Sequence, residues 1–302
     1  MKRLAWLFET GLFILLSIPL AMLPFRFSIK VGEILGLFLF YIWGSRRKIA
    51  IENIMLSAIS PAPGGSAEAD SQPSAINIAK ETFKNLGKSF IEVIKIYYGL
   101  GEKIIDSVEI KGIENFNQAK AKGKGVLFIT GHCGNWELMA IATSVKLSRV
   151  AGVARPFNNL YINRFIEKTR ERYGNSVIYK KGALREIIQR LRQGGCVGIL
   201  MDQAVLPNEG YTIDFIGRKA WTTKMPALIA MKTGAAVLPT FIHRTDKGHV
   251  MKIHPEVKLS EISDKEKAVV EDTKRFSGFI EDYIKAYPSE WLWIHRRWKR
   301  AG

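Results

Sequence analysis

The stretch GVLFITGHCGNWELMAIA, residues 125–142, decides the fold of this chain. Residues 126–130 form an apolar, β-branched run that is typical of a buried strand. Residues 138–142 are again apolar and are typical of the start of a buried helix. Between the two runs, Gly131 and Gly134 allow the backbone to turn sharply. The stretch therefore predicts a strand, a glycine-rich turn and a helix in direct succession.

The predicted turn carries His132, and Glu137 follows it five positions later. A neutral imidazole can act as a base near neutral pH, and a carboxylate can support the cation that then forms. The free N–H groups at the start of the next helix favour developing negative charge. A histidine near an acid is often structural, but the position after a buried strand favours a catalytic pair.

Strand-like and helix-like segments alternate from residue 107 onward. This alternation predicts an α/β fold with a single central mixed β-sheet flanked by helices. The expected strands are 108–110, 126–130, 149–154, 177–179, 197–201, 237–243 and 250–253. The expected helices of this part are 114–121, 136–146, 160–173, 183–192 and about 264–286.

The first part of the chain predicts helices that anchor it to a membrane. Residues 4–25 are apolar apart from Glu9 and a few small residues, and the run is long enough to span a bilayer. It resembles a signal peptide, but Glu9 and the lack of an A-x-A site favour a retained anchor. We expect membrane-associated helices at 1–56, a flexible Pro/Gly/Ala/Ser-rich loop at 57–75 and the α/β domain at 76–302.

Composition narrows the class of partner. The chain has 302 residues with a formal net charge of +17, which predicts an anionic partner. No zinc-finger spacing or RNP-like motif is present, so we expect no nucleic acid, and the apolar N-terminus favours a membrane. The two cysteines, Cys133 and Cys196, indicate no disulfide framework. The histidines are scattered, so we expect no metal site. We also expect no cofactor.

Further polar residues follow the predicted strands, where ligand loops of open sheets lie. The motif GVARPFNN, residues 152–159, follows one strand, and Asp202 and Gln203 end another. A loop at FIGRK, residues 215–219, could cover a ligand or be a plain turn. The C-terminal WLWIHRRWKR, residues 291–300, interleaves aromatics with cations; we favour a membrane-surface patch over a packed cap.

These motifs together resemble a known family. GHCGNWE, GVARPFNN, DQ, FIGRKA and WLWIHRRWK occur in that order over nearly the whole chain. In this respect the chain is similar to the bacterial lipid A biosynthesis acyltransferases of the lauroyl/myristoyl type, within the lysophospholipid acyltransferase superfamily. The segment at residues 60–74 departs from the family pattern, which usually has a shorter link there.

The resemblance implies an enzyme of the bacterial inner membrane with its active site facing the cytoplasm. It implies an acyl carrier protein thioester as donor and a lipid A precursor as acceptor. His132 and Glu137 match the family's catalytic pair, and Arg170 and Asp202 fall where the family has further polar residues. We assign to substrate binding Asn135, Arg155, Asn158, Arg170, Asp202, Gln203 and Arg218.

The expected chemistry is attack of an acceptor hydroxyl on a thioester carbonyl. His132 would act as the general base, with Glu137 holding the imidazole tautomer, and no acyl-enzyme is required. Two alternatives remain open. One is an acyltransferase for another glycolipid or a glycerophospholipid, and the other is a non-enzymatic membrane protein that binds anionic lipids.

Overall fold

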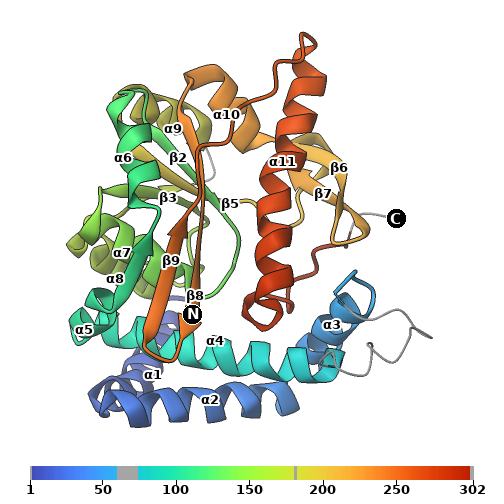
Figure 1. The fold of residues 1–302 in the computed structure, drawn as a ribbon. Helices are drawn as coiled ribbons and strands as arrows, with labels where there is room; N and C mark the ends of the chain where they lie inside the picture. The colour runs from blue at the N-terminus through green and yellow to red at the C-terminus, as the bar shows by residue number, and fades with distance from the viewer. Residues whose placement is uncertain (1, 60–73, 180–181, 300–302) are drawn as a thin grey trace.

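The computed structural model describes residues 2–59, 74–179 and 182–299, and it contains a seven-stranded mixed sheet flanked by helices (Figure 1). This confirms the predicted fold class. The flexible loop predicted at 57–75 lies mostly outside the described residues. The division of the chain at residues 56 and 75 stays a prediction.

The strand order of the main sheet is β1-β9-β8-β2-β5-β3-β4, which places β2 at its centre. All neighbouring pairs are parallel except β8 with β9. Every residue of β2 is buried, as its continuous apolar run predicts. The strands are β1 Val108–Lys111, β2 Val126–Thr130, β3 Val150–Ala154, β4 Ser176–Tyr179, β5 Cys196–Leu200, β8 Ala236–Thr245 and β9 Gly248–Ile253.

Crossover helices join the parallel strands and cover the sheet (Figure 1). Two of them begin with an Asn cap: Asn135 accepts a hydrogen bond from the Leu138 amide, and Asn159 accepts from those of Tyr161 and Ile162. The helices of this part are α5 Glu102–Asp106, α6 Ile113–Ala121, α7 Trp136–Lys146, α8 Leu160–Arg172, α9 Ala183–Arg192, α10 Met225–Thr233 and α11 Lys265–Ala286.

A two-stranded antiparallel hairpin, β6 Gly210–Phe215 and β7 Arg218–Thr223, was not predicted. Its turn residues Ile216 and Gly217 both have positive φ, 48° and 76°, which is typical of a tight type I′ turn. Residues 215–219 therefore contain a tight hairpin turn, and the ligand-covering role of this loop stays a prediction. Short alternating strands next to a single glycine gave too weak a pattern to separate from a loop.

The N-terminal helices α1 Lys2–Met22, α2 Phe25–Ile42 and α3 Gly44–Met55 lie at one end of the molecule, against α4 Ala75–Tyr97 (Figure 1). Helices α2 and α4 meet at backbone distance through Gly32, Gly36 and Gly87. A Cβ on Gly87 would lie 2.0 Å from the Gly32 carbonyl oxygen. By length and composition alone, α1 could cross a membrane.

The C-terminal aromatic segment forms a packed cap, so our preference for a membrane-surface patch was wrong. Trp291, Trp293 and Trp298 are buried, and the Arg297 side chain is fully enclosed. Arg297 donates to the Trp221 carbonyl oxygen and to Thr222 Oγ1, and its guanidinium lies 4.5 Å from the centroid of the Phe215 ring. Arg297 thus has its partners on the hairpin, which sequence spacing alone does not show.

Candidate active site

Strand pairing brings His132 and Asp202 together at the centre of the sheet. In the register of β2 and β5, Thr130 pairs with Leu200, so both side chains lie two residues beyond the last paired positions. Parallel strands end at the same edge of the sheet, which places the two residues side by side. His132 Nδ1 lies 2.8 Å from Asp202 Oδ1, and the His132 backbone N–H donates to Asp202 Oδ2 at 2.9 Å.

The Asp202 carboxylate is held in its ionised form. It is buried, and Trp291 Nε1 donates a further hydrogen bond to Oδ2 at 2.8 Å. Burial alone would raise the pKa of Asp202, but the His132 ring, the His132 N–H and Trp291 hold it well below its usual range. An ionised carboxylate only accepts hydrogen bonds, so the imidazole proton is on Nδ1 and the lone pair is on Nε2.

The lone-pair nitrogen of His132 faces the Gln203 amide. Gln203 Nε2 lies 3.1 Å from His132 Nε2, in position to donate to it. The ring also meets Trp136 nearly edge to face, with centroids 5.0 Å apart. A small cavity next to this ring is lined by residues of α4 and of the C-terminal segment, including Thr82, Ser89 and Trp291. Nε2 is therefore the atom of the pair that can take a proton from a bound group.

Glu137 does not contact the imidazole as we expected, and this corrects the predicted geometry. Its carboxylate receives a bidentate pair from Arg170, Nε to Oε1 and Nη2 to Oε2, both at 2.7 Å. The Tyr97 hydroxyl donates to Oε1 at 2.8 Å. The reason for the difference is direction: Glu137 begins α7 and points toward α4 and α8, whereas Asp202 stands beside the His132 turn.

Asn135, which we assigned to substrate binding, is buried and supports the turn instead. It caps α7, and its Nδ2 donates to Glu92 Oε2 at 2.9 Å. Glu92 is fully buried on α4 and also forms an ion pair with the Arg244 guanidinium, while His249 Nε2 lies 3.4 Å from Oε2. These partners offset the desolvation of the buried Glu92 carboxylate. Through Asn135, the cluster stabilises the turn that carries His132.

We expect Glu92→Gln to lower the free energy of unfolding at neutral pH by about 3–5 kcal/mol, because it leaves the partly buried Arg244 charge without its partner. Burial alone would raise the pKa of Glu92, but interactions with His249 and Arg244 outweigh it and lower the pKa to about 2. The stabilisation is therefore complete above the ordinary carboxyl pKa, 4.5, and is lost as pH falls toward 2.

Urea unfolding in detergent at pH 7 and pH 3 measures this effect. The deficit of Glu92→Gln should shrink at pH 3, where the parent protein has itself lost part of the contribution. The exposed Glu261, changed to Gln, is the matched control and should leave unfolding unchanged at both pH values. An equal deficit at the two pH values would contradict the expected linkage.

Among the described residues, three further predicted binding residues form no hydrogen bond with the His132–Asp202 pair. Arg155 and Asn158 are exposed in the loop between β3 and α8. Arg218 starts β7, and its guanidinium lies 4.7 Å from the centroid of the Trp298 ring. The structure thus brings His132, Asp202 and Gln203 together, and it joins Glu137 with Arg170 nearby.

Cys133 is buried next to the pair, as a packing residue would be. Burial and the nearby Asp202 and Glu290 charges raise the pKa of its thiol well above the ordinary value. Its backbone pairs with that of Trp291. A neutral, enclosed thiol is a poor nucleophile.

We expect Cys133→Ser to keep transfer activity within about tenfold of the parent, because the hydroxyl fits the same space and the buried thiol is not expected to carry the acyl group. Initial rates of the purified variant measure this. Mass spectrometry of the parent protein with donor alone is the complementary check, and an acyl group found on Cys133 would identify it as the nucleophile.

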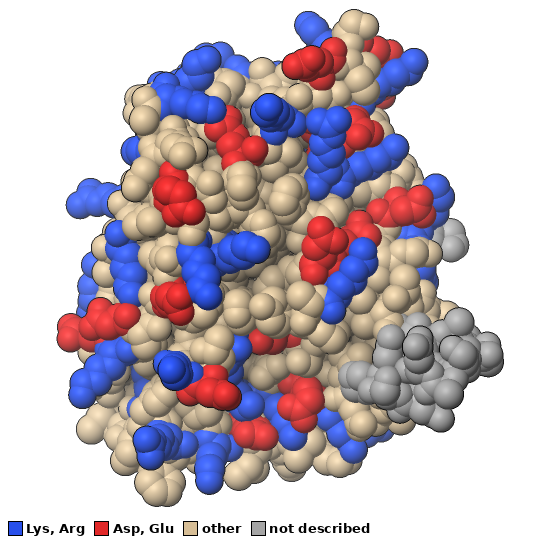
Figure 2. Space-filling model, viewed as in Figure 1, with Lys and Arg blue, Asp and Glu red and all other residues tan. Residues whose placement is uncertain are grey.

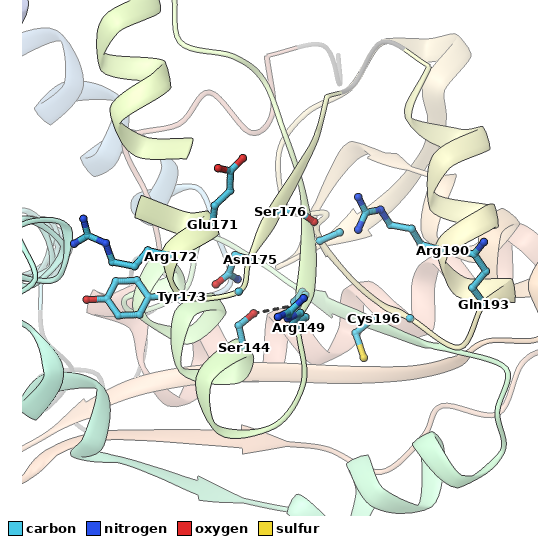
Figure 3. A pocket seen from close by; sticks show the side chains of 14 residues that line it. Ser144, Arg149, Glu171, Arg172, Tyr173, Asn175, Ser176, Arg190, Gln193 and Cys196 are labelled. Atoms are coloured by element: carbon cyan, nitrogen blue, oxygen red, sulfur yellow. Dashed lines mark hydrogen bonds between the residues drawn. The ribbon is translucent and has the colours of Figure 1, made fainter. Parts of the chain in front are cut away.

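A larger cavity, of about 710 Å³, lies at the opposite edge of the sheet (Figure 3). Its lining includes Val150, Ser176 and Cys196, the first residues of β3, β4 and β5, whereas His132 follows the end of β2. Arg149 and Arg190 also line it. The large cavity is therefore separate from the candidate active site.

Figure 2 shows that Lys and Arg side chains are spread over much of the visible face.

Sequence reasoning missed several residues of the site: Trp291, which donates to Asp202; Tyr97, which donates to Glu137; Glu92, which accepts from Asn135; and Arg244, which pairs with Glu92. Trp291 and Tyr97 fall in motifs or helices that we had noted for other reasons. The one signal available for Glu92 was an acid at a position of α4 that the helical period marks as buried.

A model of one protein family matches residues 2–300 of this chain: bacterial lipid A biosynthesis acyltransferase. The chain belongs to this family. The match extends from the first apolar helix to the C-terminal cap, so it includes His132, Asp202 and Trp291. The family resemblance noted from the motifs is thereby confirmed.

The relatives fall into two groups by acceptor. A lipid A biosynthesis acyltransferase of Haemophilus influenzae is 23% identical over 69% of this chain and 67% of its own length. A lipid A biosynthesis palmitoleoyltransferase of Escherichia coli is 25% identical over 72% of this chain and 70% of its own. A phosphatidylinositol mannoside acyltransferase of Mycobacterium tuberculosis is 26% identical over 63% of this chain and 59% of its own. The chain is thus an acyltransferase of this family, and both kinds of acceptor occur among its relatives.

Proposed function

We propose that this protein transfers a fatty acyl chain from an acyl carrier protein thioester to a hydroxyl of a lipid A precursor. The observation that carries the proposal is the His132–Asp202 pair, whose geometry leaves the lone pair of Nε2 as a base. Acyl transfer to an alcohol needs such a base, because an un-ionised hydroxyl is a weak nucleophile.

In the proposed reaction, the acceptor oxygen attacks the thioester carbonyl carbon while His132 Nε2 takes the hydroxyl proton. Asp202 stabilises the imidazolium, because its carboxylate already accepts a hydrogen bond from the Nδ1–H group of His132. The tetrahedral intermediate then expels the thiol sulfur, and the imidazolium returns its proton to the thiolate. Atoms and charges balance without an acyl-enzyme.

Gln203 and Arg170 have separate tasks in this proposal. A bound hydroxyl must replace the Gln203 amide at His132 Nε2, and the displaced amide N–H is then free to donate to the developing oxyanion. Arg170 donates two of its five N–H groups to Glu137, and we assign it to ordering the start of α7 rather than to gripping substrate. Arg155 is exposed and suits an acceptor phosphate.

Charge supports the proposed partners. The net charge of +17 favours an acidic carrier protein and a phosphorylated, anionic acceptor. The apolar N-terminal helices support a reaction at a membrane, and we propose that the active site faces the cytoplasmic side, where acyl carrier proteins are found. The mannoside relative supports a second candidate acceptor, a phosphatidylinositol mannoside.

The test is a transfer assay with purified protein in mixed micelles. Radiolabelled acyl carrier protein thioester is offered with a lipid A precursor, a phosphatidylinositol mannoside or a lysophospholipid, and products are identified by mass spectrometry. We expect an acylated lipid A precursor. Acyl-coenzyme A in place of the carrier thioester tests the donor.

The products of this assay identify both the acceptor and the donor. Transfer to the mannoside alone would replace the acceptor and keep the chemistry, whereas preference for acyl-coenzyme A would replace the donor. Absence of transfer with every pair, by protein that is folded and vesicle-bound, would favour a non-enzymatic lipid-binding role. The His132→Ala variant is the blank for each pair.

A further inference from the structure

Helix α1 is docked on the catalytic body at positions from Trp6 to Ala21. Near its start, Asn159 Nδ2 donates to the Trp6 carbonyl oxygen and to Glu9 Oε2, both at 3.0 Å. In the middle, the Phe13 ring meets Phe165 edge to face, with centroids 6.4 Å apart. These contacts join α1 to α8, the helix whose other end carries Arg170.

The second half of α1 is held by α4. Ser17 Oγ and the Tyr98 hydroxyl are 2.7 Å apart. Lys95 Nζ donates to the carbonyl oxygens of Ala21 and Leu23, at 2.8 and 2.6 Å. The docked positions recur every three or four residues, so they form one stripe of the helix. From Trp6 to Ala21 the stripe is about 22 Å long at 1.5 Å per residue.

This docking conflicts with a helix that leaves the body to cross a bilayer. A spanning α1 would either lose these partners or carry α4 and α8 through about 30 Å of hydrocarbon. Helix α4 bears Lys80, Lys84, Lys88 and Lys95, which hydrocarbon does not accommodate. A spanning α1 that lost its partners would also expose the Glu9 carboxylate to lipid, away from Asn159.

The undocked face of α1 is apolar, and neighbouring segments also expose apolar side chains. The side chains of Leu4, Phe8, Leu15 and Met22 are between 68% and 72% exposed. Further large apolar side chains are exposed on α2 and at the start of α8: Phe27, Ile34, Phe38, Ile42, Phe157 and Leu160. Exposed cations accompany them at the ends of the helices, namely Lys2, Arg3, Arg26 and Lys30. Apolar area flanked by cations fits the surface of an anionic lipid leaflet.

We propose that α1 does not cross the membrane but lies in the plane of one leaflet, with α2 and the Phe157–Leu160 tip as parts of the same lipid-contacting face. The N-terminus and the catalytic body are then on the same side of the membrane. The proposal rests on the contacts of α1 and holds whichever acceptor the enzyme uses.

Labelling from one side of the membrane tests the proposal. Lys2→Cys and Lys247→Cys are each placed in the parent chain, whose own Cys133 and Cys196 are buried and supply the background. Lys247 is exposed in the turn between β8 and β9 and marks the side of the body. Inverted and right-side-out vesicles are treated with a membrane-impermeant maleimide. We expect both variants to label in the same vesicle orientation.

Label on Lys2→Cys only from the side opposite to Lys247→Cys would overturn the proposal. So would labelling of Lys2→Cys that appears only after detergent is added. A second measurement places the tip: a fluorophore on Phe157→Cys should be quenched strongly by lipid-attached quenchers. Val145→Cys is the matched control, since Val145 is 50% exposed against 51% for Phe157 but lies on α7. Equal quenching at the two positions would remove Phe157 from the lipid-contacting face.

Discussion

We expect His132→Ala to lower the turnover number for acyl transfer by about 10²–10⁴-fold, the usual effect of losing a general base. The variant should still fold, because Asp202 keeps its hydrogen bonds from the His132 backbone N–H and from Trp291. Binding of the acceptor should change little, since the lost group acts on the proton in transit. Initial rates at saturating donor and acceptor measure the effect.

The matched control is His254→Ala, a half-buried histidine that packs on Phe241 and Phe279 away from the Asp202 carboxylate. It should retain turnover close to that of the parent. Unfolding curves of both variants establish that the comparison is between folded proteins. Turnover of His132→Ala within about tenfold of the parent would remove this residue from the proton-transfer step.

The sheet could be predicted because its strands are continuous apolar runs. Residues 126–130 are buried throughout, and a buried parallel strand has no polar face to disturb the pattern. The hairpin of β6 and β7 lies outside the main sheet, and its buried and exposed residues alternate over only six residues in each strand. So short a pattern could not be distinguished from a loop.

Part of the candidate site could also be located from the sequence, and its catalytic role stays a prediction. His132 was singled out because a turn after a buried strand presents its side chain at the edge of the sheet. Its carboxylate partner was not, because sequence shows that Asp202 ends a strand but not that this strand is the neighbour of β2. Closeness in sequence favoured Glu137, whereas the strand order places Asp202 against the ring.

Asp202→Asn should lower turnover as severely as loss of the histidine, by about 10²–10⁴-fold, through the wrong imidazole tautomer. In the parent, Oδ2 accepts from the His132 N–H and from Trp291, so in the variant the amide oxygen will take that position. The amide N–H then faces Nδ1, which must accept. The imidazole proton moves to Nε2, and the base is lost although every side chain keeps its place.

The control for a buried Asp-to-Asn change is Asp272→Asn, since Asp272 is fully buried and accepts from the Ser260 backbone N–H away from His132. It should keep its turnover. Glu137→Gln separates the two carboxylates: with Asp202 against the imidazole, it should weaken the Arg170 pair and cost less than Asp202→Asn. The opposite result would be a nearly active Asp202→Asn variant and an inactive Glu137→Gln variant. It would assign the support of the imidazole to Glu137, because the carboxylate that stabilises the imidazolium must cause the larger loss of turnover when it is neutralised.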